Sequence, residues 1–234
     1  MEFKTDKLLH GGDYNPEQWL DRPDILVEDI RLMKLAHVNN VSLGIFSWAF
    51  LEPEEGKYDF SFWDEFLALA AEENMKVVFC TPTATPPAWL TTKYPEVLYA
   101  DVDGNLIRHG MRRHASLNSP KYIEKSRIIT EKLAEHYGDC KTIVGWQIDN
   151  EINCEKDVYY SESDHAAFAV YLKEKYKTLD ALNDAMGTVF WNQTYTDWNQ
   201  VRLTQHTNNG STNPHMALEE KRFISDTCVR FIQM

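Results

Sequence analysis

An Asn-Glu pair closes a short apolar run, and its carboxyl group is the first candidate for chemistry in this sequence. The run extends from Ile143 to Ile148, and Asp149, Asn150 and Glu151 follow it. A carboxyl group at the rim of a buried strand lies beside low-dielectric walls, where desolvation favours the protonated form. Such a group can donate a proton near neutral pH. Glu151 is therefore the candidate general acid.

The ordinary alternative is that the Asn-Glu pair leaves a strand and enters a solvated loop, because most acidic residues are surface groups. The preceding segment favours chemistry instead. Val144, Trp146 and Ile148 make it apolar enough to be covered on both faces, as parallel strands packed under helices are. Active sites of barrels built from such strands gather at the carboxyl ends of the strands. The sequence therefore predicts that Glu151 lies at such an end.

Short strand-like runs alternate with longer helical ones, which predicts parallel β-α units rather than an antiparallel sandwich. Strands are expected at residues 8–13, 40–46, 76–81 and 142–150. Apolar residues at spacings of three and four predict helices around them. These helices are expected at about residues 22–37, 62–74 and 120–137, the last with Ser119 and Pro120 at its start and Gly138 at its end.

Beyond Glu151 the pattern is helical, and no fifth strand is expected. Helices are predicted around Leu172, before Gly187 and around Ile224, with a polar loop at about residues 190–214. A closed (β/α)₈ barrel needs eight strands and at least ~200 residues, with ~250 typical. The fold class is therefore expected to be α/β, of the (β/α)₈ TIM-barrel type, with only about the first half present as one domain over residues 1–234.

Composition excludes several kinds of partner. The chain has 24 Lys and Arg against 36 Asp and Glu, a formal charge of −12, which disfavours phosphate backbones and anionic membranes. No uncharged stretch reaches membrane-spanning length, and the start lacks the apolar core of a secretory signal. The four cysteines are far apart and predict reduced thiols. We expect a cytoplasmic protein that binds neither nucleic acid nor membrane.

The aromatic content indicates a sugar ligand. Trp, Tyr and Phe make up 12% of the residues, several of them beside Asn, Gln or acidic side chains. Such mixtures suit sugars, whose C–H faces stack on rings while their hydroxyls need hydrogen bonds. For any single ring, filling a core is an equally good explanation.

Five short motifs follow one another along the chain. They are Gly12 to Trp19; Gly44 to Pro53 with Gly56 to Phe60; Thr83 to Leu90; Arg112-Arg113-His114; and Trp146 to Glu151. Together they resemble the amino-terminal part of a glycoside hydrolase family 42 β-galactosidase, and the resemblance covers nearly the whole chain. Five ordered motifs at proper intervals are far more specific than any one of them.

The resemblance implies a retaining exo-acting glycosidase that removes terminal β-linked galactose, on a TIM barrel followed by smaller domains absent from this chain. Glu151 matches the family's acid/base carboxylate, and Asn150 matches the neighbour that hydrogen-bonds the sugar. Arg112 matches a substrate-contacting arginine, and Trp191 corresponds to a ring that lines the galactose pocket. The expected partners are a galactoside and further copies of the chain, because related proteins often form trimers.

A retaining enzyme uses two carboxyl groups about 5–5.5 Å apart, one as nucleophile and one as acid and then base. Glu151 takes the second role. In the family the nucleophilic glutamate lies on a much later strand, beyond Met234, and no motif in this chain resembles it. We therefore expect the isolated chain to be inactive.

The sequence departs from the family at a metal site. Many members hold zinc through one cysteine shortly after the Arg-Arg-His run and three soon after the acid/base residue. Here Ser116 stands near the first place, and only Cys154 follows Glu151 in that segment. A structural zinc site needs several thiolates at suitable spacing. We expect no zinc and no other cofactor.

Two other functions remain open. An Asn-Glu strand end is shared among barrel glycosidases, so the chain could belong to an endo-β-glucanase or β-mannanase, although the Arg-Arg-His and Thr-Ala-Thr-Pro-Pro runs favour a galactosidase. It could also be a non-catalytic sugar-binding module. For single residues, Arg112 could form a structural ion pair and Asn150 could satisfy backbone groups in a turn.

Overall fold

The computed structural model describes residues 7–154 and 158–234, which form two compact units. The first unit comprises Met1–Trp89 and Ser126–Glu151, and the second comprises Leu90–Lys125 and Ile152–Met234. Among the helices of the described ranges, none combines the length and apolar character that crossing a bilayer requires.

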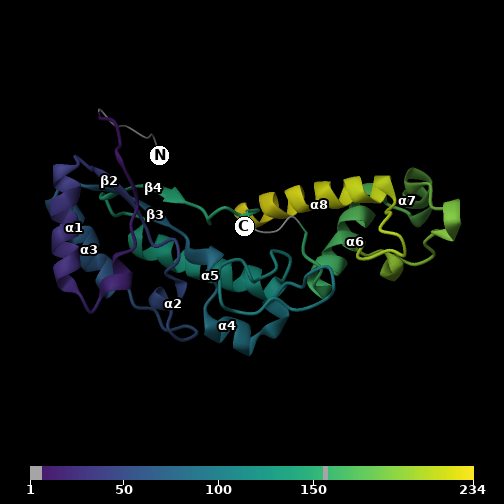
Figure 1. The fold of residues 1–234 in the computed structure, drawn as a ribbon, viewed down its shortest axis with the longest axis horizontal. Helices are drawn as coiled ribbons and strands as arrows, with labels where there is room; N and C mark the ends of the chain where they lie inside the picture. The colour runs from purple at the N-terminus through teal and green to yellow at the C-terminus, as the bar shows by residue number, and fades with distance from the viewer. Residues whose placement is uncertain (1–6, 155–157) are drawn as a thin grey trace. The chain divides into compact units, whose positions relative to one another are not determined.

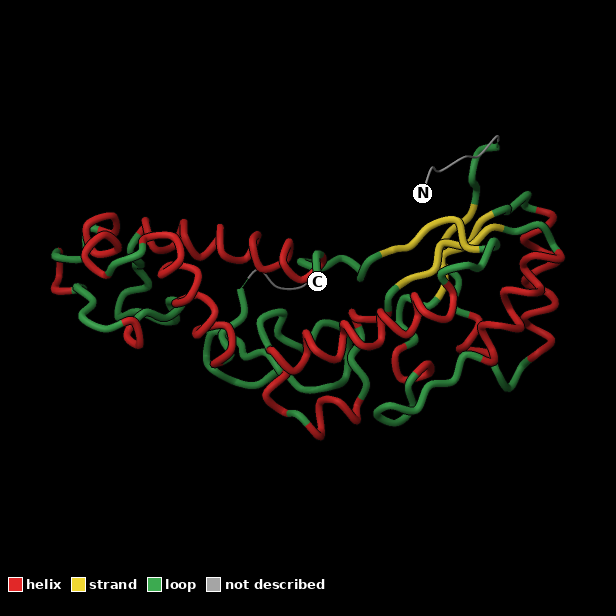
Figure 2. The backbone as a smooth tube through the Cα atoms, turned by 180° about the vertical axis from the view of Figure 1, so that it is seen from behind, coloured by secondary structure: helices red, strands yellow, loops and turns green. Residues whose placement is uncertain are grey.

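Four parallel strands form the sheet of the first unit, in the order in which they occur in the chain. The strands lie side by side in Figure 2, and Val41 pairs with both Gly12 and Val77. Parallel neighbours in chain order are the arrangement that successive β-α units produce. All four predicted strands are confirmed: β1 (Gly11–Asp13), β2 (Asn40–Leu43), β3 (Lys76–Cys80) and β4 (Ile143–Gln147).

Helices connect these strands, and the three that were predicted here are confirmed. They are α1 (Pro23–Leu35), α3 (Ser61–Glu72) and α5 (Pro120–Tyr137), of which the part from Ser126 belongs to the first unit. Helices α1 and α3 are neighbours (Figure 1), and Lys34 Nζ lies 2.6 Å from a carboxylate oxygen of Glu73.

The core of the first unit forms around Phe79 of β3, which is fully buried. Its ring lies 5.7 Å from the ring of Trp63 in α3 and 5.0 Å from the ring of Tyr137 in α5. Burying one such apolar side chain contributes roughly 1.5–3 kcal/mol. Helix α3 presents Trp63, Phe66 and Ala70 to this core. The sequence pattern places Phe62, Phe66 and Leu69 on the buried stripe; of these Phe66 is buried, and Phe62 and Leu69 are half-buried.

Strand β4 differs from its prediction in length and in burial. It ends at Gln147 rather than near residue 150, because Asp149 and Glu151 have positive φ angles that an extended strand does not allow. The prediction that it is covered on both faces is wrong, since Ile143 alone of its residues is buried and Ile148 is 49% exposed. Within the described ranges β4 has β3 as its one strand neighbour, which leaves its other edge open.

Several short elements were not predicted. Two are helices of four and six residues, α2 (Trp48–Leu51) and α4 (Ala88–Lys93). The others are single 3₁₀ turns: η1 (Pro16–Trp19), η2 (Pro82–Ala84), η3 (Pro95–Val97), η4 (Phe190–Asn192) and η5 (Trp198–Gln200). Elements of this length do not complete enough turns to show a period in the sequence.

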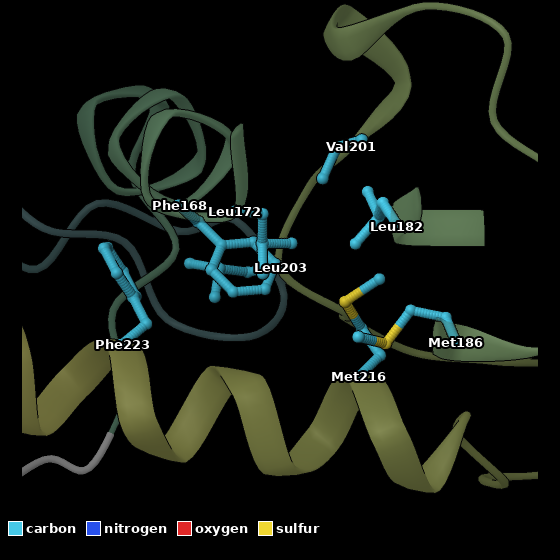
Figure 3. Close-up of a cluster of buried hydrophobic side chains, with 8 residues drawn as sticks. All are labelled: Phe168, Leu172, Leu182, Met186, Val201, Leu203, Met216 and Phe223. Atoms are coloured by element: carbon cyan, nitrogen blue, oxygen red, sulfur yellow. The ribbon is translucent and has the colours of Figure 1, made fainter. Parts of the chain in front are cut away.

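The second unit is mainly helical, as predicted. Its helices α6 (Glu162–Tyr176), α7 (Leu179–Met186) and α8 (Pro214–Ile232) enclose a cluster of buried apolar side chains (Figure 3). Helix α6 begins with a capping box made by Ser161 and Asp164, and α7 ends at Gly187, whose φ is 62°. The cluster consists of Phe168, Leu172, Leu182, Met186, Val201, Leu203, Met216 and Phe223.

A buried carboxylate joins α6 and α8 in the second unit. Glu219 is 2% exposed and accepts hydrogen bonds from Lys175 Nζ at 2.6 Å, Arg222 Nη1 at 2.5 Å and the Tyr171 hydroxyl at 3.3 Å. Burial disfavours its charged form, but the hydrogen bonds from Lys175 and Arg222 outweigh burial, so the pKa of Glu219 is lowered.

We predict that Glu219→Gln lowers the free energy of unfolding at pH 7 by about 1.5–3 kcal/mol, the range for hydrogen bonds to a charged group. A carboxyl pKa lowered by folding gives stability above the unfolded value, 4.5 for Glu, that is lost as pH falls through the folded value. Urea unfolding of both proteins at pH 7 and pH 3 measures this. A difference that stays unchanged at pH 3 would contradict the assignment.

Candidate active site

Glu151 lies in the loop that follows β4, directly after Asn150. Because the four strands are parallel, this loop emerges at the same edge of the sheet as the loops after β1, β2 and β3. The residue as a whole is exposed to solvent, which differs from the position beside low-dielectric walls that was expected for it. Its exposure agrees with the open edge of β4.

Asn150 is half-buried and has defined partners within the same loop. Its backbone N–H donates to Oδ1 of Asp149 at 2.6 Å, and its side-chain Oδ1 accepts a hydrogen bond from Gln147 Nε2 at 3.1 Å. The carboxamide is therefore held at a fixed place beside Glu151. Its amide nitrogen is the side-chain donor that could reach a sugar hydroxyl.

Other polar groups lie at the same edge of the sheet. Glu17, in η1 after β1, accepts a hydrogen bond from the Ser47 hydroxyl at 2.8 Å. Burial raises the pKa of Glu17, and the Ser47 hydrogen bond opposes this. Burial and the Asp13 carboxylate raise the pKa of Cys80 to about 12, so this free cysteine is a thiol at neutral pH and a poor nucleophile.

Arg112 belongs to the second unit, in the loop before α5, and is half-buried. The next residue, Arg113, is 5% exposed and has a φ of 63°. Burial raises the pKa of Tyr159, and the positive charge of Arg113 counteracts this increase. Arg113 is thus part of the interior of this unit, whereas Arg112 is the more exposed of the two residues.

Trp191 also belongs to the second unit, in η4, and its side chain is 72% exposed. Its ring stacks on that of Phe190 with centroids 4.7 Å apart, and its φ is 56°. Both rings line a groove of about 700 Å³ together with amide side chains that include Asn209 and Asn213. Exposed rings beside amide groups provide the stacking faces and hydrogen bonds that sugars need.

The residues near the family's zinc position do not fit a zinc site. Ser116 donates its hydroxyl to Asp164 Oδ1 at 2.6 Å, and Asn118 donates to the same oxygen at 2.9 Å. Cys154 is exposed. Across residues 7–154 and 158–234, three or more His, Cys, Asp or Glu residues nowhere gather in a way that could hold a metal ion.

The sequence interpretation missed three residues that contact the Asn-Glu loop. Asp149 is 2% exposed, and its carboxylate and backbone contact Thr83 and Thr81, which follow β3. Polar residues directly after two neighbouring parallel strands could have indicated this contact, because both strands end at the same edge. The structure thus groups Asn150 and Glu151 with Asp149, while Arg112 and Trp191 lie in the other unit.

Four parallel strands in chain order, with polar and acidic residues after them, are the arrangement of α/β-barrel enzymes, whose sites lie at the carboxyl ends of the strands. Comparison with known proteins narrows this class. A family model described as Beta-galactosidase, that of glycoside hydrolase family 42, matches residues 13–234. The chain belongs to this family.

Relatives and solved structures agree with this assignment. The chain is 47% identical to β-galactosidase BglY of Alicyclobacillus acidocaldarius, over 96% of this chain and 32% of that protein. It is 41% identical to GalA of Bacillus licheniformis, over 97% of this chain and 33% of that protein. A β-galactosidase structure from Rahnella matches 97% of this chain and 33% of its own, with a TM-score of 0.90 and 41% identity.

These matches confirm the predicted fold class. The neighbours include Gan42B, a family 42 β-galactosidase from G. stearothermophilus, with a TM-score of 0.89 and 41% identity over 96% of this chain and 32% of that structure. The four parallel strands and their helices are the first part of this TIM-barrel fold. The chain spans about a third of the length of the curated relatives it matches.

Proposed function

We propose that this chain supplies the acid/base part of a retaining β-galactosidase site, with Glu151 as the carboxyl group that protonates the departing glycosidic oxygen. The observation that carries this proposal is the place of Glu151, in the loop after the fourth parallel strand of a family 42 chain. The names of the relatives, all β-galactosidases, support a galactoside as the substrate.

The chemistry requires two carboxyl groups with alternating roles. In a retaining enzyme one carboxylate attacks the anomeric carbon, while the other protonates the leaving oxygen and later activates water. The charge of the ionised nucleophile favours a protonated partner, and esterification of the nucleophile removes that charge. The same carboxyl can then act as acid in the first step and as base in the second.

Three further residues are proposed to bind the galactosyl group. The Asn150 carboxamide donates to a sugar hydroxyl while Gln147 holds its oxygen. Arg112 presents a planar fork of donors that suits adjacent hydroxyls better than a lysine would. The exposed ring of Trp191 offers a stacking face for the sugar. No zinc or other cofactor takes part in this scheme.

We propose that the nucleophilic glutamate belongs to the part of the barrel that this chain does not span. Removing a nucleophile abolishes the covalent route and costs many orders of magnitude in rate. The purified chain is therefore expected to release no more nitrophenol from an aryl β-galactoside than its Glu151→Gln variant does. Robust turnover that Glu151→Gln abolishes would refute this expectation.

The substrate is tested by supplying the rest of the barrel. A hybrid joins this chain to the remaining two thirds of the Rahnella β-galactosidase, which matches it at a TM-score of 0.90. We expect it to hydrolyse aryl β-galactosides in preference to β-glucosides and β-mannosides. Preference for a glucoside or mannoside would instead indicate another retaining glycosidase. Galactose binding by calorimetry without any turnover would indicate a sugar-binding module.

A further inference from the structure

The backbone after β4 is left-handed at two residues that are not glycine. Asp149 has a φ of 59° and Glu151 has a φ of 45°. Such a conformation costs on the order of 1–3 kcal/mol per residue and persists only where surrounding contacts determine it. Aspartate tolerates it because its short side chain can hydrogen-bond locally, an advantage that glutamate lacks. Some contact must therefore hold this loop in place.

The side chain of Asp149 provides that contact. It is 2% exposed, and its Oδ1 accepts the backbone N–H of Asn150 at 2.6 Å. Its Oδ2 accepts a short hydrogen bond from the Thr83 hydroxyl. Hydrogen bonds to an ionised acceptor are about twice as strong as neutral ones, so this carboxylate fixes the backbone from which Asn150 and Glu151 project.

The main chain of the loop is held from the neighbouring strand as well. The backbone N–H of Asp149 donates to Thr81 Oγ1 at 2.7 Å, and Thr81 N–H donates to the Gln147 carbonyl at 3.0 Å. Thr81 and Thr83 are each 2% exposed, so solvent does not compete for these bonds. The segment after β3 therefore determines the conformation of the loop after β4.

A second side chain completes the arrangement. Gln147 Nε2 donates to the Asp149 carbonyl at 3.2 Å and to Asn150 Oδ1 at 3.1 Å. One amide group thus orients both the backbone before Asn150 and the Asn150 side chain. Side chains thus contact the Asp149 carbonyl, the backbone N–H groups of Asp149 and Asn150, and the Asn150 carboxamide.

We propose that Asp149, held by Thr81 and Thr83, is a positioning residue that sets the direction in which Glu151 and Asn150 leave the sheet. This inference rests on the function proposed for Glu151. Asp149 itself is buried and bonded to the protein, so it acts on the sugar through its two neighbours. A buried carboxylate that only filled space would cost stability, since charge burial is unfavourable without partners.

The test removes one hydroxyl without changing the shape of its side chain. In Thr83→Val, amide hydrogen exchange of Asp149 and Asn150 should be at least about tenfold faster, the factor expected for losing a hydrogen bond to a charged group. The Asn150 amide proton should also shift upfield in the NMR spectrum, because its acceptor is no longer fixed. Thr83→Ser keeps the hydroxyl and should restore both signals.

The matched control is Thr85, which lies in the same loop after β3 as Thr83. Thr85 donates its hydroxyl to the Pro82 carbonyl at 3.4 Å, so Thr85→Val makes the same chemical change away from Asp149. It should leave both amides as they are. Unchanged exchange in Thr83→Val would overturn the proposal, and so would equal acceleration of the amides of β2, since that indicates general destabilisation.

A second variant covers the case in which Thr83→Val does not fold. Thr81 is 2% exposed, and Thr81→Val removes the acceptor of the Asp149 backbone N–H while keeping a similar shape. The Asp149 amide should exchange several-fold faster in this variant, and no change would overturn the proposal. These measurements are made on the chain itself without substrate, so they stand apart from the hybrid's turnover, whose absence would refute the proposed function instead.

Discussion

Glu151→Gln in the hybrid with the Rahnella barrel is expected to lower kcat/KM for an alkyl β-galactoside by about 10²- to 10⁴-fold, the usual contribution of general acid-base catalysis. Glutamine has nearly the same shape as glutamate, but its amide protons are far too weakly acidic to be transferred to an alkoxide leaving group. Steady-state kinetics on the purified hybrid and its variant measure this loss. The expected effect is large because an alkoxide departs poorly without protonation.

The leaving group distinguishes acid catalysis from general damage to the site. A dinitrophenolate departs without help from an acid, so Glu151→Gln should reduce glycosylation of the enzyme by a dinitrophenyl β-galactoside far less than by the alkyl substrate. Pre-steady-state release of dinitrophenol reports this step. Equal losses for both substrates would contradict the acid role and indicate that the variant has lost binding or structure.

A control for this substitution lies elsewhere in the first unit. Glu72 is exposed at the end of α3, the helix that leads to the amino end of β3. Glu72→Gln makes the same chemical change, yet catalytic groups of a barrel gather at the carboxyl ends of the strands. Its kcat/KM should remain within about twofold of the unmodified hybrid for both substrates.

The sequence predicted the repeating elements well because their signals extend over many residues. The helix at residues 61–72 shows its period through Phe62, Phe66 and Leu69, at spacings of four and three, although the structure buries Trp63, Phe66 and Ala70. Strands β3 and β4 were predicted for a similar reason, since each lies in an apolar run between helical segments. Their parallel order then follows from the rules of β-α connection.

The local geometry of the candidate site could not be predicted in the same way. The sequence places Glu151 after the fourth strand, but its positive φ depends on contacts that Thr81 and Thr83 make from a distant part of the chain. Burial of β4 was overestimated because an apolar run does not reveal whether its second edge has a neighbour. Tertiary contacts therefore decide both the backbone conformation of Glu151 and the burial of β4.

The exposed ring of Trp191 illustrates the same limit. The family resemblance implied that this ring contacts sugar, yet nothing in the sequence indicated its left-handed backbone or its 72% exposure. The backbone N–H of Gln193 donates to the Thr188 carbonyl at 2.7 Å, which closes the turn that carries the ring. A one-turn motif of this kind has no periodic pattern to detect.

Phe168→Ala is expected to lower the free energy of unfolding of the second unit by about 3–5 kcal/mol, the range for truncating a buried phenylalanine. Phe168 is fully buried in the cluster of Figure 3, and its ring lies 5.3 Å from that of Phe223 in α8. The substitution removes this aromatic contact and leaves a cavity that rigid helix packing cannot fill completely. Urea unfolding, followed by the helical circular dichroism signal, measures the loss.

Val170 provides the matched control, because it lies on the same helix, α6, but is 54% exposed. Val170→Ala should change the free energy of unfolding by less than about 1 kcal/mol, since alanine also favours the helix. A Phe168→Ala variant no less stable than Val170→Ala would contradict the assigned core. Both substitutions shorten an apolar side chain on the same helix, but Phe168 is buried and Val170 is exposed. A difference between the two losses of stability is therefore due to burial.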